Sequence, residues 1–224
     1  MIPKIAHFHW TGGPMSWLRT VSIASFKKFN PDWEIRLHDT HPHVKQYGLR
    51  YCQQADWTWW KALGEYGGFQ VATDIVFVRP VPDDWLSCDM NACTRETSAV
   101  YQFAMMGAIA GHPYIVEADR RCQEMAEGAH AFHELDQLMG IDMLRTIHPE
   151  LLRSGRFFDQ PMGALCRFSP YDVNALWNSG DISLEPNVIG VHWYGGHPRS
   201  KAEEPIAMPG HPSFLVKLAQ RVFP

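Results

Sequence analysis

Residues 54–78 read QADWTWWKALGEYGGFQVATDIVFV, and this stretch decides the fold class. Residues 54–66 have the apolar spacing of a helix, and Gly67-Gly68 stands where glycine commonly ends one. Residues 69–78 are rich in β-branched and aromatic side chains, as in a buried strand. The stretch therefore predicts a helix that leads directly into a strand, with Asp74 inside that strand or at a break in it.

The same alternation continues on both sides of this stretch. We expect strands at 4–10, 33–38, 90–94, 104–110, 164–168 and 188–193, and helices at 16–29, 114–127, 133–144 and 212–222. Alternating strands and helices are typical of an α/β sheet. Ligands of such sheets bind at the carboxyl ends of strands. Trp10, Asp74 and His192 each lie near such an end, so we group them as site candidates.

Composition narrows the class of protein. The 224 residues fit one domain, and 46% hydrophobic with 20% charged residues indicates a globular chain. The formal net charge of -4 argues against a general nucleic-acid binder. Nine tryptophans provide flat aromatic surface that suits rings and sugars.

The cysteines and the apolar segments allow predictions about the cellular compartment and about membrane spans. Five cysteines without CxxC spacing predict reduced thiols in a cytoplasmic protein, not a disulfide framework or a zinc site. The longest apolar segment, residues 103–111, is too short to span a bilayer, and no secretion leader is apparent. We therefore expect no membrane span.

Four blocks of sequence carry a family resemblance. They are residues 2–13 (IPKIAHFHWTGG), 30–35 (NPDWEI), Ala55-Asp56 and 66–74 (YGGFQVATD). In this order they resemble the DXD-containing sugar transferases, which include yeast Golgi alpha-mannosyltransferases and glucosylating bacterial toxins. The resemblance is good over the first third of the chain and patchy beyond it.

The resemblance implies a GT-A-type fold, which is a single Rossmann-like nucleotide-sugar-binding domain with a mixed, mainly parallel sheet. Residues 1–85 would form the nucleotide-sugar half, and residues 86–224 the acceptor-side half with a metal and diphosphate loop. The implied activity is retaining transfer of a hexose from a nucleoside-diphosphate sugar, UDP foremost, with Mn²⁺ or Mg²⁺. A divalent cation offsets the charge of a diphosphate leaving group and takes carboxylate ligands.

The DXD position itself is altered. Asp74 corresponds to the second Asp, the metal ligand, which we predict to be catalytic. Ala72 replaces the first Asp, so the chain reads Ala-Thr-Asp, with Thr73 beside the donor. This loss should weaken donor binding unless another carboxylate compensates. The alternative for Asp74 is a polar turn residue after a buried strand.

The helix before the motif carries two further candidates. Asp56 matches a family Asp that bonds donor hydroxyls, and we class it as catalytic and donor-binding. Trp59 lies on the same helix face as Asp56, at a position where the family has Arg. The replacement implies a different donor sugar or different contacts with it. The alternatives are a solvated charge and a core tryptophan. Gln70 replaces a family Tyr near the donor.

The end of the first strand is predicted to bind the nucleotide base. Trp10 corresponds to the aromatic residue that stacks on uracil, although a core tryptophan is the alternative. Phe8, His9 and Gly12 complete this donor-binding segment.

A late segment is predicted to complete the metal and diphosphate site. His192 would be a second metal ligand, because neutral imidazole commonly binds metals. The backbone of Gly195 and Gly196 would approach phosphate, and Arg199 and Lys201 would neutralise it.

Acceptor contacts are expected at Glu96, Asp159 and Gln160. The acceptor could be a glycan, a lipid-linked sugar, a protein or a modified nucleic-acid base. Two other functions stay open. One is a non-catalytic nucleotide-sugar or glycan-binding protein with a degenerate DXD, and the other is a viral-type glucosyltransferase that acts on hydroxylated DNA bases.

Overall fold

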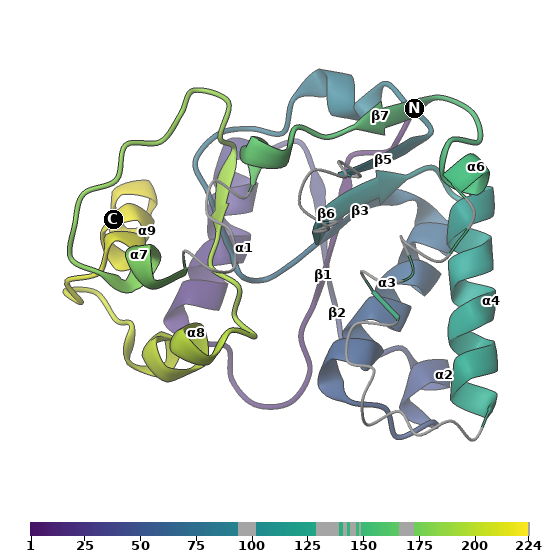
Figure 1. Cartoon of the computed structure of the whole chain (residues 1–224), viewed down its shortest axis with the longest axis horizontal. Helices are drawn as coiled ribbons and strands as arrows, with labels where there is room; N and C mark the ends of the chain where they lie inside the picture. The colour runs from purple at the N-terminus through teal and green to yellow at the C-terminus, as the bar shows by residue number, and fades with distance from the viewer. Residues whose placement is uncertain are drawn as a thin grey trace. The chain divides into compact units, whose positions relative to one another are not determined.

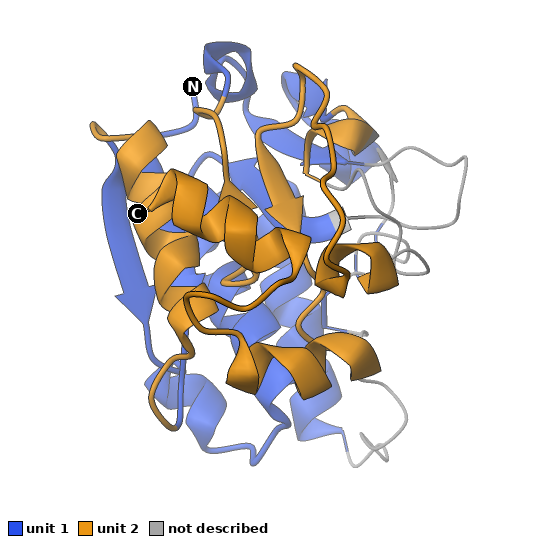
Figure 2. Cartoon of the chain, turned by 90° about the vertical axis from the view of Figure 1, so that its left-hand side faces the viewer, with its two compact units in different colours: residues 1–12, 33–71, 82–160 blue, residues 13–32, 72–81, 161–224 orange. Residues whose placement is uncertain are grey.

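The structure is a computed structural model, and it describes residues 1–93, 102–128, 139–140, 143, 147, 149–165 and 173–223. The chain divides into two compact units, coloured in Figure 2. Unit 1 comprises residues 1–12, 33–71 and 82–160, and unit 2 comprises residues 13–32, 72–81 and 161–224. The predicted division at residue 85 stays a prediction.

Unit 1 is built on a six-stranded sheet in the order β2-β1-β3-β6-β5-β7 (Figure 1). β1 is parallel to β2 and β3, β5 is parallel to β7, and β6 is antiparallel to β3 and β5. The predicted mixed, mainly parallel sheet is thereby confirmed. The strand bounds are β1 Ile5–His9, β2 Glu34–His38, β3 Gly68–Val71, β5 Met90–Cys93, β6 Gln102–Ala108 and β7 Phe157–Asp159.

The register of β1 brings polar side chains onto one face of this sheet. His7 pairs with Gln70 of β3, and His9 pairs with His38 of β2. Paired residues point to the same face and alternate residues share it, so His7, His9, Gln70 and His38 lie on one face. His7, His9 and Gln70 are buried, which means that each polar atom there needs a partner.

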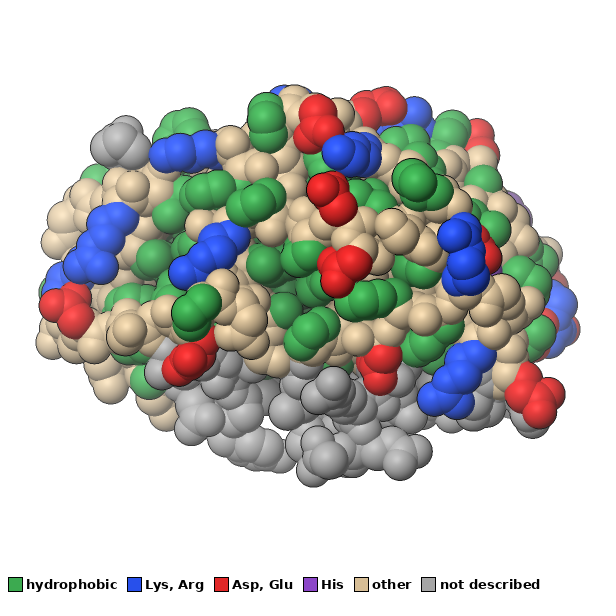
Figure 3. All heavy atoms as spheres, turned by 90° about the horizontal axis from the view of Figure 1, so that it is seen from above, with side chains coloured by type: hydrophobic (Ala, Val, Ile, Leu, Met, Phe, Trp, Pro, Cys, Tyr) green, Lys and Arg blue, Asp and Glu red, His purple; other side chains and the backbone are tan. Residues whose placement is uncertain are grey.

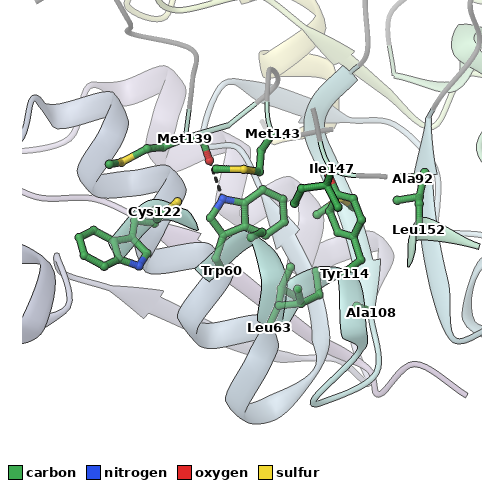
Figure 4. Close-up of a cluster of buried hydrophobic side chains, with 14 of the residues drawn as sticks. Trp60, Leu63, Ala92, Ala108, Tyr114, Cys122, Met139, Met143, Ile147 and Leu152 are labelled. Carbon is green, nitrogen blue, oxygen red and sulfur yellow. Dashed lines mark hydrogen bonds between the residues drawn. The ribbon is translucent and has the colours of Figure 1, made fainter. Parts of the chain in front are cut away.

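Helix α3 packs on β1 and β3, and α4 packs on α3. Figure 4 shows Trp60 of α3 within a cluster of buried apolar side chains of unit 1. Its indole nitrogen donates to the carbonyl oxygen of Met139 at 2.5 Å. The bond satisfies the polar edge of a fully buried ring. The helices of unit 1 are α2 Pro42–Lys45, α3 Tyr51–Tyr66, α4 Pro113–Glu127 and α6 Pro149–Leu152, with a 3-10 helix at Asp83–Leu86.

Unit 2 has its own core around a two-stranded antiparallel sheet. β4 (Ile75–Phe77) pairs with β8 (Gly190–His192), so that Ile75 faces His192. Helix α1 packs on β4 and on α9. The helices of unit 2 are α1 Trp17–Phe29, α7 Val173–Trp177, α8 Pro198–Glu203 and α9 Phe214–Val222, with 3-10 helices at Met162–Ala164 and Glu204–Ile206.

Two serines of α1 satisfy the free edge of β4. The hydroxyl of Ser25 accepts from the backbone N–H of Phe77 at 3.0 Å, and that of Ser22 accepts from Ile75 at 3.4 Å. Both serines are fully buried. An unpaired strand edge inside a core would leave N–H groups unsatisfied, so these hydroxyls replace a neighbouring strand.

Several predicted elements are confirmed with shifted bounds. Ser16 caps α1 as predicted, accepting from the backbone N–H of Arg19. Helix α3 ends at Tyr66 with Gly67 as its C-cap, as predicted, but it begins at Tyr51 rather than at residue 54. The earlier start follows from the Gln53 side chain, which accepts from the backbone N–H of Arg50 at 3.0 Å.

The expected strand at 69–78 is two strands, β3 and β4, with a break at residues 72–74. A strand at 164–168 was expected, but Ala164 ends a 3-10 helix, and residues 166–168 lie outside the described part of the chain. The expected helix at 133–144 lies almost wholly outside it as well. Sequence reasoning missed α2, α6, β7, α7 and α8, which are short.

Within the described ranges, no helix is long and apolar enough to cross a membrane. Cys52, Cys88, Cys93 and Cys122 form no disulfide bond, and Cys166 lies outside the described residues.

Candidate functional site

Asp74 lies at the break between β3 and β4, where the chain passes from unit 1 to unit 2. Its backbone carbonyl accepts from the N–H of Trp193 at 3.0 Å, which continues the pairing of β4 with β8. The pairing brings two predicted metal ligands together, because Asp74 Oδ2 lies 3.2 Å from Nε2 of His192. The two side chains are 14% and 13% exposed, so both are largely shielded from water.

The turn after β8 closes on the same carboxylate. The backbone N–H of Gly195 donates to Asp74 Oδ2 at 2.6 Å. Tyr194, just before it, has φ +50°, a left-handed conformation that costs a non-glycine residue energy. The Tyr194 ring packs on the ring of His192 at 4.1 Å between centroids. Strained backbone of this kind concentrates at functional sites.

The electrostatics of Asp74 favour its charged form. Burial alone would raise its pKa, but the neighbouring His192, the positive charge of Arg19 and the Gly195 hydrogen bond outweigh burial. The pKa of Asp74 is therefore lowered, and the side chain is an ionised carboxylate at neutral pH. A carboxylate in that state is what a divalent cation requires of a ligand.

Arg19 and Glu204 form a buried ion pair beside Asp74, and sequence reasoning missed both. Arg19 Nε donates to Glu204 Oε1 at 2.7 Å, and Nη2 donates to Oε2 at 3.1 Å. Arg19 Nη1 donates to the hydroxyl of Thr73 at 2.7 Å. No local pattern could have indicated the pair, because the two residues are 185 positions apart.

The chemistry of Asp74 and His192 can be tested against a metal ion. Two neighbouring ligands of an octahedral cation at about 2.1 Å would lie about 3 Å apart, close to the separation found here. Among the described residues, no three His, Cys, Asp or Glu side chains gather into a metal cluster. The pair therefore suits a cation that keeps open positions for phosphate and water, and it does not suit a structural zinc site.

The remaining residues of the predicted diphosphate segment lie further out. Gly196, Arg199 and Lys201 are not buried, and Arg199 forms an ion pair with Glu203 at 2.7 Å. The segment becomes helical at Pro198, where α8 begins. Of this predicted set, the described residues bring Gly195 alone into hydrogen-bond contact with Asp74.

The predicted base-binding segment belongs to unit 1. Trp10 is half-buried and meets Tyr51 edge to face, with ring centroids 6.1 Å apart. Gly12 has φ +94° and open space at the position of a side chain, so its backbone can be approached closely. The side chain of Phe8 is fully buried in the core of the unit.

His9 carries an unpartnered lone pair. The Thr40 hydroxyl donates to Gln54, so Thr40 can only accept from His9 Nε2, which lies 3.2 Å away. His9 Nδ1 is then a buried acceptor without a partner among the described residues. Burial lowers the pKa of His9 to about 4, so the ring is neutral at pH 7.

Asp56, Trp59 and Gln70 surround Phe103 in unit 1. Gln70 Nε2 donates to the Phe103 carbonyl at 2.6 Å, and the rings of Trp59 and Phe103 meet edge to face at 5.9 Å. A Cβ on Gly140 would overlap the Asp56 carboxylate and lie 3.2 Å from Phe103, so Asp56 borders the same ring.

This group holds unsatisfied polar atoms. Trp59 Nε1, a donor, and Gln70 Oε1, an acceptor, are buried without a partner in the part of the chain that the structure describes. Burial raises the pKa of the half-buried Asp56 well above its usual range. Unpaired buried polar atoms cost free energy, and a ligand hydroxyl could satisfy both kinds at once.

Two of the three predicted acceptor residues are described. Asp159 is exposed at the end of β7. Gln160 is buried, and its amide donates to Asn91 and to the carbonyl of Met105. Glu96 lies outside the described residues.

No protein-family model matches the sequence, and no curated protein sequence matches it. Solved structures do. A glycosyltransferase involved in glycosylation of the major capsid of PBCV-1 matches with a TM-score of 0.53 and 9% identity, over 90% of this chain and 99% of that one. The glycosyltransferase GlyE of Streptococcus pneumoniae TIGR4 matches with a TM-score of 0.57 and 12% identity, over 99% of this chain and 60% of that one. This chain has a glycosyltransferase fold.

A third match supports the same fold. An active-site mutant of LgtC matches with a TM-score of 0.52 and 12% identity, over 97% of this chain and 94% of that one. The predicted α/β fold of GT-A type is thereby confirmed. At these identities, the likeness of this glycosyltransferase fold to its neighbours extends to architecture and not to individual side chains.

Proposed function

We propose that the protein is a metal-dependent glycosyltransferase that moves a hexose from a nucleoside-diphosphate sugar to a hydroxyl acceptor. The fold supports glycosyl transfer in general. The observation that carries the finer proposal is the ionised Asp74 carboxylate, held 3.2 Å from the His192 imidazole beside a strained turn. Shielding an ionisable pair from water costs free energy, and such pairs concentrate at functional sites.

Asp74 and His192 would hold a Mn²⁺ or Mg²⁺ ion. Such an ion acts as a Lewis acid that offsets the negative charge of the departing diphosphate. Asp74 supplies a charged oxygen, and His192 supplies a neutral nitrogen once Nε2 is free of its proton. Gly195 orients the carboxylate through its 2.6 Å hydrogen bond, so that a single oxygen carries both contacts.

The polar atoms of unit 1 support a sugar-bearing donor. Trp59 Nε1 can donate to a hydroxyl, Gln70 Oε1 can accept from one, and Asp56 can do either according to its protonation. Trp10 offers an aromatic face for a base, with UDP as the proposed nucleotide. Retention at the anomeric carbon is proposed from the resemblance to the DXD-containing sugar transferases.

A non-catalytic sugar-nucleotide binder is the second candidate. Ala72 favours it, because the position lacks the carboxylate that the DXD motif would place there. Transfer to hydroxylated DNA bases is less well supported. On the face drawn in Figure 3, Lys and Arg side chains are interspersed with Asp and Glu, and no basic stripe for a phosphate backbone stands out.

Donor hydrolysis with Mn²⁺ and without acceptor separates an enzyme from a binder. We expect the wild type to release UDP slowly from UDP-hexoses, because transferases leak to water. Asp74→Asn keeps the shape but loses the charge, and we expect its rate to fall by about 100-fold or more. Asp181→Asn, which alters a carboxylate that is 77% exposed in unit 2, is the matched control and should keep the wild-type rate.

A folded wild type that binds UDP-hexose but releases no UDP would establish the binder. Equal rates for Asp74→Asn and the wild type would exclude Asp74 as the metal ligand.

A further inference from the structure

Glu204 accepts hydrogen bonds from three residues of unit 2, two at the start of α1 and one directly after β8. Arg19 donates twice, Ser16 donates its hydroxyl at 2.7 Å, and Trp193 donates its indole N–H at 3.4 Å. The Glu204 side chain is 11% exposed and that of Arg19 is 15% exposed. A buried carboxylate with this many donors is well satisfied and fixed in position.

The same arrangement places the Arg19 guanidinium next to Thr73, which precedes Asp74 in the chain, and next to Gly195, which donates to the Asp74 carboxylate. Arg19 Nη1 donates to Thr73, which directly precedes Asp74. A Cβ at Gly195 would overlap Arg19 Nη2 and would lie 3.2 Å from Asp74 Oδ2. The guanidinium thus occupies the space that a side chain at position 195 would need, next to the Gly195 N–H that donates to Asp74.

Further bonds tie this turn to α8. The Ser200 hydroxyl donates to the carbonyl of Trp193, and the Trp177 indole N–H donates to the Ser200 hydroxyl at 3.1 Å. Residues 193–204 thus have two anchors, Ser200 and Glu204, through which the chain is held to α7 and α1. Gly195 lies near the start of this segment, so the bonds of Ser200 and Glu204 also hold Gly195 in place.

We infer that Arg19, clamped by Glu204, is a positioning residue that fixes the Asp74 carboxylate and the Gly195 amide for metal binding. The inference rests on the proposed function for its metal, but the positioning itself does not need one. Arg19 acts through Thr73 and Gly195, and no contact with substrate is required of it.

Arginine suits this role for two physical reasons. The three nitrogens of its planar guanidinium bond both oxygens of Glu204 and also the Thr73 hydroxyl. A lysine carries all its N–H donors on one nitrogen and cannot span these acceptors in the same way. Its charge is also balanced by that of Glu204, with which it forms an ion pair at 2.7 Å.

Hydrogen exchange of the Gly195 amide tests the inference without any metal. In Arg19→Lys, which keeps the charge but loses the fork, we expect this amide to exchange about ten-fold faster or more. Glu204→Gln keeps the shape and should give the same result if Arg19→Lys folds poorly. Amides of α9 should be unaffected in both variants, and Arg221→Lys, in an exposed ion pair, is the matched control. An unchanged Gly195 amide would overturn the inference.

The double variant tests whether the two residues act as one unit. Arg19→Lys combined with Glu204→Gln should exchange at Gly195 no faster than the worse single variant, and multiplying effects would contradict the clamp.

Metal titration of donor hydrolysis adds the functional readout. The Mn²⁺ concentration for half-maximal rate should rise about ten-fold in Arg19→Lys, with kcat at saturating metal within about three-fold of wild type. A variant with an unchanged metal midpoint overturns the inference and leaves the proposed function standing. A wild type that binds no metal overturns the proposed function, whereas the Gly195 exchange result still decides whether Arg19 positions the turn.

Discussion

A buried polar atom is stable only with a partner, and the side chains of this protein divide by that criterion. Gln160, Trp60 and His7 have protein partners for their buried groups. Trp59 Nε1 and Gln70 Oε1 have none among the described residues, although both border Phe103. The difference separates side chains that hold the fold from side chains whose polar atoms await a ligand or a water molecule.

His7 shows how fully a core histidine can be satisfied. Its Nε2 donates to the Gly67 carbonyl at 2.7 Å, so Nδ1 must accept from His38 Nε2 at 2.8 Å. Burial lowers the pKa of His7 to about 4, which keeps the ring neutral. His7 is therefore a structural residue that joins β1 to the end of α3.

Trp59→Phe tests whether the unpartnered indole N–H serves a ligand. The ring contacts with His9 and Phe103 should survive, so the free energy of unfolding should change by less than about 1 kcal/mol. Affinity for the UDP-hexose should fall by about five- to ten-fold, corresponding to one lost hydrogen bond, with UDP affinity unchanged. Calorimetric titration of both ligands measures the two effects. Equal losses for UDP and UDP-hexose, or none, would assign the N–H to a bridging water instead.

At the scale of elements, the sequence predicts most helices and strands, but it leaves open whether the strand breaks at Asp74, and the structure has that break at residues 72–74. Residues 69–78 form an almost unbroken apolar stretch, interrupted locally only by Gln70, Thr73 and Asp74. The break arises because β3 pairs with β1 and β6, whereas β4 pairs with β8. Such partner changes depend on contacts between distant segments, which local pattern cannot supply.

Short elements escaped prediction for a related reason. β7 has three residues and α7 has five. These lengths are too short for the alternation of a strand or the helical spacing of apolar residues to be recognised in the sequence. Their positions are set by pairing with β5 and by packing on α9. Capping, by contrast, is local, and Ser16 and Gly67 were predicted correctly.

The attachment of α1 to β4 gives a prediction at this scale. Ser25→Ala leaves the buried Phe77 N–H without its acceptor, so we expect a loss of about 1–3 kcal/mol in the free energy of unfolding. Ser22→Ala should cost less, because its bond to Ile75 is longer at 3.4 Å. Urea denaturation compares the two variants with the wild type. The reverse order would mean that the serine hydroxyls do not complete the edge of β4.

Across the whole molecule, the candidate site was predicted in part. Asp74 and His192 were identified from their positions near strand ends, and the pairing of β4 with β8 brings them to 3.2 Å. Arg19 and Glu204 were not, because an ion pair between residues 185 positions apart leaves no trace in one sequence. Strand-end position and the family resemblance thus indicated the two groups proposed to bind a cation, whereas the ion pair beside them could be found only in the fold.

The last prediction concerns linked binding of the nucleotide and the metal by the intact protein. If Asp74 and His192 hold a cation that also contacts a diphosphate, then Mn²⁺ and UDP must each raise the affinity for the other by the same factor. A ligand at about a hundred times its dissociation constant adds about 2.7 kcal/mol to stability, which thermal unfolding detects readily. We therefore expect Mn²⁺ and UDP together to raise Tm by more than the sum of their separate effects.

Asp74→Asn should abolish that excess and leave the smaller effect of UDP alone, because the carboxamide keeps the shape of the side chain but loses the charge that would hold the cation. Asp181→Asn should keep the full excess, as an exposed carboxylate elsewhere in unit 2. If the two ligands act additively on the wild type, the metal and the diphosphate do not share a site. If the excess persists in Asp74→Asn, they share one that Asp74 does not form, and the proposal for this carboxylate fails on a measurement that requires no turnover.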